Sequence, residues 1–159
     1  MTKNKPKKSI LDLIDEDMKT TKTYANMILM SNDKTKLLIL QRANYMKKFG
    51  GKWGFPGGQL DKNDKCLKDT AVRELLEETG IILTFNEIQG IKKIDSIKNE
   101  DGSISEYYMT QCERENISDY SIKLSGEHSR YEWYGRDSRK GHKWMPDVFQ
   151  IIQKLFDQN

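Results

Sequence analysis

The feature that most constrains the fold of this chain is a single strong helix signal near its middle. The helix begins after Asn63 or Asp64, either of which can cap it, and ends before Gly80, which is a typical C-terminal stop. Apolar side chains recur within it at helical spacing: Leu67, Ala71, Leu75 and Leu76. A helix with one apolar stripe must pack that stripe against another layer, so the flanking segments should supply a sheet.

Strand signals lie on both sides of this helix. Residues 24–30 and 36–41 are predicted to pair as a hairpin around the turn-forming residues 31–34. Strands are also expected over 81–85, 88–97, 105–112 and 131–134, with 99–102 as a hairpin turn. Pro146 is expected in the first turn of a final helix whose apolar stripe comprises Val148, Phe149, Ile152, Leu155 and Phe156. The order predicts an α/β fold with a mixed sheet between helices.

The length of 159 residues allows one domain with a real hydrophobic core. The longest apolar runs, 37–40 and 81–83, are too short to cross a bilayer, and no N-terminal stretch resembles a signal peptide. We therefore expect a cytoplasmic protein with no membrane partner. Residues 1–8 are rich in lysine and read as a flexible basic arm, either a solvated tail or a weak attractor of RNA or DNA.

Cysteine and histidine are scarce in this chain, which has two of each and no CxxC motif. A thiolate or imidazole metal cage is therefore implausible. A bound metal would need oxygen ligands, which favours Mg²⁺ or Mn²⁺.

Three glutamates share one face of the predicted helix. Glu74, Glu77 and Glu78 are three and four positions apart, so their carboxylates project together and repel one another. Arg73 is the nearest cation and cannot neutralise all three. The face is either a solvated acidic surface or a site that holds a divalent cation.

Glycines just before the helix favour the cation. Gly57 and Gly58 let the backbone approach a ligand closely and can turn a carbonyl oxygen towards a metal. A loop carbonyl together with helical carboxylates is a suitable oxygen cage for Mg²⁺.

The stretch from Gly58 to Ile81 resembles the Nudix box, G-x5-E-x7-R-E-U-x-E-E-x-G-U, where U is bulky and aliphatic. Residues 73–81, RELLEETGI, match its second half at every specified position, and 51–56, GKWGFP, resemble the usual lead-in. The resemblance implies an α/β/α sandwich over residues 21–159, preceded by a flexible segment over 1–20.

The resemblance also implies roles for the matched residues. Glu74, Glu77 and Glu78 would bind Mg²⁺ or Mn²⁺ with a backbone oxygen of Gly57, and Arg73 would orient the carboxylates. The cations would bridge the diphosphate oxygens of the substrate and activate a water for attack on phosphorus. Glu77 and Arg73 thereby become candidate catalytic residues.

The box departs from the family pattern at one place. Counting forward from Gly58 puts Asp64 where glutamate is expected, whereas counting back from Arg73 puts Lys65 there. The loop thus carries one extra residue, and the sequence leaves open whether Asp64 replaces the missing carboxylate.

Further candidates lie outside the box. Residues 127–133, EHSRYEW, resemble a pattern before a late strand of many Nudix proteins, so Glu127 is a candidate catalytic residue. His128 is either a second candidate base or a hydrogen-bonding histidine. Arg42 could reach a phosphate or be an ordinary surface arginine, and Phe55 could stack on a base or pack in the core. Gly58 completes the candidate substrate-binding residues.

These observations predict a metal-dependent hydrolase that cleaves the pyrophosphate of a nucleoside diphosphate linked to a moiety X. X could be phosphate, a sugar, a second nucleotide or the 5′ end of an RNA, with a small nucleotide as the default substrate. The alternative is a catalytically weak Nudix domain that senses a nucleotide and regulates a partner. The sequence carries no information on oligomeric state.

Overall fold

The computed structural model describes residues 21–158, so the predicted basic arm and the segment before residue 21 lie outside the described residues. The strands are β1 Thr23–Met30, β2 Lys36–Arg42, β3 Trp53–Gly54, β4 Gly57–Gln59, β5 Lys92–Lys98, β6 Ile104–Gln111 and β7 His128–Gly135. The helices are α2 Leu67–Thr79, α3 Phe85–Gln89 and α4 Val148–Asp157, with a 3₁₀ turn at Ile117–Asp119.

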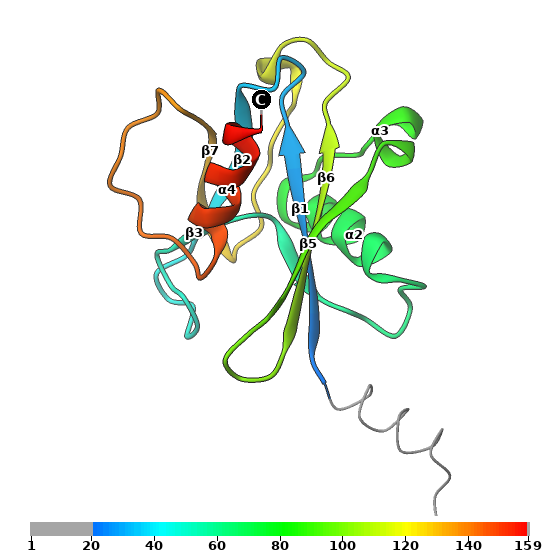
Figure 1. Cartoon of the computed structure of the whole chain (residues 1–159), viewed down its shortest axis with the longest axis vertical. Helices are drawn as coiled ribbons and strands as arrows, with labels where there is room; N and C mark the ends of the chain where they lie inside the picture. The colour runs from blue at the N-terminus through cyan, green and yellow to red at the C-terminus, as the bar shows by residue number, and fades with distance from the viewer. Residues whose placement is uncertain (1–20, 159) are drawn as a thin grey trace, which may run out of the picture.

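The strands form one mixed sheet with β1 at its centre (Figure 1). The order along the main path is β3-β2-β1-β6-β5, with β4 paired to β1 and β7 paired to β2. Strands β1 and β6 run parallel, and the other pairs are antiparallel. The parallel pair requires a long crossover, and this crossover contains α2 and α3.

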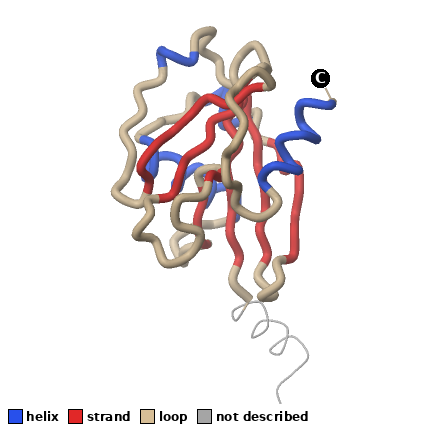
Figure 2. The backbone as a smooth tube through the Cα atoms, turned by 90° about the vertical axis from the view of Figure 1, so that its left-hand side faces the viewer, coloured by secondary structure: helices blue, strands red, loops and turns tan. Residues whose placement is uncertain are grey.

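Alternating residues of the central strands feed two cores. Ile28, Leu37 and Ile39 pack on the side of α4, while Leu29, Leu38 and Leu40 pack on the side of α2. Viewed at right angles to Figure 1, α4 lies on one side of the strands and α2 on the other (Figure 2). The predicted sandwich of helices around a mixed sheet is confirmed.

Both predicted hairpins are present. The backbone N–H of Ser31 donates to the Lys36 carbonyl and closes the turn between β1 and β2. Asn99 donates to the Ser103 carbonyl at 2.7 Å, and Gly102 has a φ of 87°, as the tight turn between β5 and β6 requires. Gly80, with a φ of 77°, ends α2 by donating to the Leu76 carbonyl.

The prediction of a strand over 81–85 is wrong, and so is the prediction that the next strand begins at residue 88. Residues 85–89 form α3, and β5 begins only at Lys92. Thr84 accepts a hydrogen bond from the Glu87 backbone while the Glu87 side chain accepts from Thr84 N–H, a complete capping box. The sequence Thr-x-x-Glu is a helix start signal, and here it determines the local structure in spite of the β-branched residues that precede it.

The start of α2 also differs from expectation. The N-cap is Cys66, without a side-chain cap, so neither Asn63 nor Asp64 caps the helix. Pro146 lies just before α4, which begins at Val148. Within residues 21–158, no helix is long and apolar enough to span a membrane.

Candidate active site

Arg73 organises the acidic face of α2. Its Nη1 donates to Glu74 Oε1 at 3.0 Å and to both Glu77 oxygens at 3.2 Å. The positive charge that Glu74 and Glu77 need is therefore supplied partly by this guanidinium. Glu77 remains open to solvent, with 55% of its side chain exposed.

Asp64 holds the other edge of the same guanidinium. Its Oδ1 accepts from Arg73 Nε at 3.0 Å and its Oδ2 from Nη2 at 2.9 Å, a bidentate pair. Thr70 Oγ1 and the Asp61 N–H also donate to Oδ2. The hydrogen bonds from Arg73 hold the pKa of Asp64 well below its usual range. Of the two positions that the sequence left open, it is therefore Asp64 whose carboxylate orients Arg73.

Glu78 is the carboxylate that Arg73 does not reach. It is buried, with 4% exposed, and its Oε2 accepts a hydrogen bond from Gly57 N–H at 2.9 Å. Burial first, and then the nearby charge of Glu74, raises the pKa of Glu78 to about 9. Burial also raises the pKa of Glu74. Both shifts have the sign expected where burial outweighs the nearby positive charges of Arg73 and Arg42.

The glycines of β4 approach these carboxylates closely. A Cβ on Gly58 would lie 2.4 Å from the Glu74 carboxyl group, and one on Gly57 would lie 2.6 Å from the Ala25 carbonyl oxygen. Gly57 lies opposite Asn26, next to the hydrogen-bonded pair that Met27 forms with Pro56. Because bonded and non-bonded pairs alternate in an antiparallel ladder, the N–H and C=O of Gly57 face away from β1, towards Glu78.

The predicted segment around Glu127 closes over the end of α2. Ser125 N–H donates to the Glu78 carbonyl, and Ala43 N–H donates to the Glu127 carbonyl. The Glu127 carboxylate is exposed and close enough to contribute to the raised pKa values of Glu74 and Glu78. The structure thus brings Glu127 to the same site.

His128 is buried behind Glu127. Burial, and then the charge of Arg42, lowers the pKa of His128 to about 4, so the imidazole is neutral at pH 7. Among residues 21–158, its buried Nδ1 has no hydrogen-bond partner. The hydrogen-bonding alternative for this histidine is therefore not realised at Nδ1.

A cleft of about 630 Å³ adjoins these residues and lies within the range of small-molecule sites. All three predicted substrate-binding residues, Arg42, Phe55 and Gly58, line it together with Gly57 and His128. Phe55 is also a core residue, with 6% exposed and its ring edge-on to Tyr107. Trp133 is not among the cleft residues and packs against the core on the α2 side.

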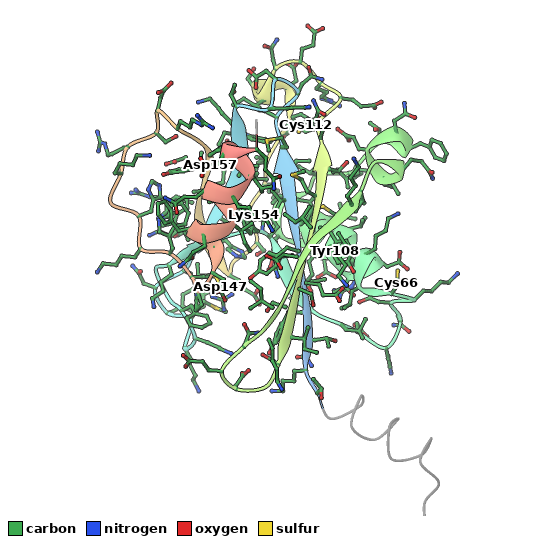
Figure 3. All side chains as sticks on the ribbon, in the orientation of Figure 1. Cys66, Tyr108, Cys112, Asp147, Lys154 and Asp157 are labelled. Carbon is green, nitrogen blue, oxygen red and sulfur yellow. The ribbon has the colours of Figure 1, made fainter. Side chains whose placement is uncertain are left out.

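Other cleft residues were missed from the sequence. They include three separate segments, Lys48 and Phe49, Lys98–Asp101, and Met145–Val148, as well as strand residues such as Asn26 and Ser105. Phe49 and Asp147 have positive φ values of 61° and 69°, conformations that non-glycine residues rarely adopt and that no sequence signal marked. Asp147 stands at the start of α4 (Figure 3).

The donor atoms at this site fit a hard divalent cation. They are carboxylate oxygens and a backbone carbonyl, with no sulfur donor, and within residues 21–158 Glu78 forms no ion pair. Within residues 21–158, no three acidic, histidine or cysteine side chains already converge as a ready-made metal cage. A cation would therefore compete with Arg73 for Glu74 and Glu77.

Comparison with known proteins places the chain in a family. The family model described as NUDIX domain matches residues 21–154. The chain is 41% identical over 61 residues to the m7GpppN-mRNA hydrolase NUDT17 of Danio rerio, an alignment that covers 38% of this chain and 20% of that protein. It is 28% identical over 109 residues to the Nudix hydrolase YvcI of Bacillus subtilis, which covers 69% of this chain and 63% of that protein.

Solved structures share the fold at low identity. The NUDIX domain of Shewanella oneidensis NrtR, solved with ADP ribose, has a TM-score of 0.70 at 20% identity and covers 95% of this chain and 99% of that chain. A bifunctional NMN adenylyltransferase/ADP ribose pyrophosphatase from Francisella tularensis, solved with AMP and a Mn ion, has a TM-score of 0.67 at 20% identity. That alignment covers 93% of this chain and 46% of that chain.

Proposed function

The chain belongs to the Nudix family, and from this premise we propose that it is a metal-dependent hydrolase cleaving the pyrophosphate of a nucleoside diphosphate linked to a moiety X. The observation that carries the proposal is Glu78, a buried carboxylate beside Glu74 that forms no ion pair in the described part of the chain. It lies against the glycines that close one end of a ligand-sized cleft.

Mg²⁺ or Mn²⁺ would be held by Glu74, Glu77, Glu78 and the Gly57 carbonyl. When bound, the cation supplies charge neutralisation of the diphosphate and an activated water. The manganese ion in the Francisella tularensis structure supports this choice of metal.

The protein's own groups have separate tasks. Arg73, fixed by Asp64, holds Glu74 and Glu77 in place through charge-assisted hydrogen bonds. Glu127 is exposed beside the glutamates and is the candidate base that takes the proton of the attacking water. Neutral His128 is the second candidate.

A nucleotide fits the cleft by size and lining. Phe55, Tyr107 and Leu40 offer apolar surface, while Arg42, whose charge acts on Glu78, also lines the cleft and can reach a phosphate. The ADP ribose and AMP in the two neighbouring structures support a nucleotide-type substrate. A cytoplasmic location, where such nucleotides are made, remains part of this proposal.

A small nucleotide is the default for X, and an RNA 5′ end is the second candidate. Lys48 lies at the cleft edge, its Nζ 5.4 Å from the Phe49 ring centroid and 6.0 Å from that of Tyr24. Cations and aromatic rings together suit a nucleic-acid strand that extends out of the cleft. The similarity to NUDT17 points the same way but covers little of that protein.

A product-release screen tests the proposal. Its panel comprises nucleoside triphosphates, nucleotide sugars, dinucleoside polyphosphates and 5′-triphosphorylated or capped RNA, each with Mg²⁺, Mn²⁺ or chelator. Metal-dependent cleavage of one class is expected and identifies X. Absence of cleavage, with thermal stabilisation by a nucleotide, would contradict the enzyme and favour the sensing domain.

A further inference from the structure

The segment 136–147 joins β7 to α4 as a long irregular loop whose last residues line the cleft (Figure 1). Its Trp144 forms an isolated bridge with Trp53. Met145, Pro146 and Asp147, at its end, line the cleft. A connection of this length without regular structure needs specific contacts to keep one conformation.

His142 supplies the main side-chain contact. Its ring stacks on Trp144 at 5.0 Å and 19°, and it meets the rings of Trp53 and Tyr134 edge-on at 5.0 and 5.2 Å. Within this aromatic enclosure, His142 Nε2 lies 3.1 Å from Glu132 Oε1 on β7. The imidazole therefore ties the segment to the sheet through one polar contact and three ring contacts.

The same segment is joined to β3 through the backbone. Trp53 N–H donates to the Lys143 carbonyl at 2.8 Å, and Met145 N–H donates to the Trp53 carbonyl at 2.9 Å. Next to Trp53, a Cβ on Gly54 would lie 2.7 Å from Met145 Sδ. The position of Met145 in the cleft wall thus follows from how residues 142–144 are seated.

The side chain of Glu132 makes one hydrogen bond within residues 21–158. Its Oε1 lies against His142 Nε2, and its Oε2 is buried without a partner there. A carboxylate directed into an aromatic enclosure costs desolvation, which the histidine contact offsets. Lys140 is a further charge near the enclosure, and its Nζ donates to the Tyr134 hydroxyl at 3.2 Å.

We propose that Glu132 and His142 are a positioning pair that seats the 136–147 segment and thereby sets the affinity of the cleft for the nucleoside part of its substrate. Neither residue lines the cleft, so the pair acts through Trp144 and Met145. The expected effect on KM rests on the proposed hydrolase function, whereas the expected effect on trypsin cleavage of the segment does not.

Trypsin tests the seating independently of activity, because the segment carries four cleavage sites: Arg136, Arg139, Lys140 and Lys143. Glu132→Ala and His142→Phe should each be cleaved there about tenfold faster than wild type, the loss expected for one hydrogen bond to a charged group. Glu132→Gln keeps an acceptor and should remain within about twofold of wild type. His142→Phe keeps a ring in the enclosure, so it separates loss of the polar contact from loss of packing.

Steady-state kinetics on the substrate found in the screen test the link to the cleft. Glu132→Ala and His142→Phe should raise KM about tenfold with kcat within about twofold, and the double variant should be no worse than either single one. Glu113→Ala is the matched control, since it removes a carboxylate that holds Asn86 at 2.7 Å and does not line the cleft. It should change neither parameter.

Tryptophan emission provides a folding check in a Trp133→Phe background, where Trp53 and Trp144 are the only tryptophans of the chain. Both contact His142, so Glu132→Ala should shift the emission to longer wavelength and Glu132→Gln should not. Unchanged trypsin sensitivity and KM in Glu132→Ala would overturn the proposal. A fall in kcat at constant KM would also overturn it. An inactive wild type with the predicted trypsin pattern would instead refute the hydrolase function alone.

Discussion

Replacing Asp64 by alanine should destabilise the protein substantially, although the position looks like an irregular loop in the sequence. Asp64 is 6% exposed and accepts hydrogen bonds from Arg73 Nε, Arg73 Nη2, Thr70 Oγ1 and Asp61 N–H. The substitution removes the acceptor of Arg73 Nε and one of the two acceptors of Nη2.

The loss of unfolding free energy expected for Asp64→Ala lies between the values for breaking a buried and a surface ion pair. Breaking a fully buried pair costs about 3–5 kcal/mol, whereas exposed pairs contribute about 0–1 kcal/mol. Arg73 is 28% exposed and retains Glu74, Glu77 and the Gln59 carbonyl as acceptors. We therefore expect a loss of about 2–3 kcal/mol, which corresponds to a fall in Tm of roughly 4–12 °C for a domain of this size.

Urea unfolding at pH 7 followed by circular dichroism measures this loss, with Lys65→Ala as the control at the neighbouring box position. The pKa of Asp64 is lowered in the folded state, so its contribution is present above the unfolded pKa of about 3.9 and is lost as pH falls below it. The difference between wild type and Asp64→Ala should therefore persist from pH 8 to 5. An Asp64→Ala protein as stable as wild type at pH 7 would refute this account of the Arg73 site.

Two further predictions concern the cleft end of the site. Gly58→Ala should lower kcat more than tenfold while costing about 1–3 kcal/mol of stability, because its Cβ would lie 2.4 Å from the Glu74 carboxyl; near-wild-type turnover would contradict this. In His128→Gln, the free energy of unfolding should fall less than in the wild type as the pH is lowered. The lowered His128 pKa of about 4 means that the folded state binds fewer protons than the unfolded state, so stability falls between about pH 6.5 and 4. Urea midpoints at pH 7 and 5 check this, and an equal drop in both proteins would argue against a buried neutral His128.

Local signals predicted the regular elements where one pattern dominated. The apolar stripe ended by Gly80 marked α2, and the Asn99–Gly102 turn marked the β5–β6 hairpin, because such signals act within a few residues. The apolar residues 81–85 predict a strand, but the capping box at Thr84 starts a helix over residues 85–89.

The candidate site could be predicted only as far as the box extended. The sequence could not decide between Asp64 and Lys65, since the choice depends on which side chain reaches Arg73 nine or eight residues away after the loop has folded. The residues that form the cleft wall could not be predicted from the sequence either. Phe49 and Asp147 adopt positive φ values that tertiary contacts impose, and the enclosure around His142 joins segments far apart in the chain.

The sequence placed Glu78 on an open acidic face, but the structure buries it, which makes its role in metal binding directly testable. In Glu78→Gln the amide can still accept from Gly57 N–H, while the metal-facing charge is removed. The most direct measurement is therefore kcat of wild type and Glu78→Gln with saturating substrate over a Mg²⁺ titration. The account predicts loss of turnover by at least about a hundredfold in Glu78→Gln at an unchanged urea midpoint. Full turnover of Glu78→Gln with Mg²⁺ would contradict it.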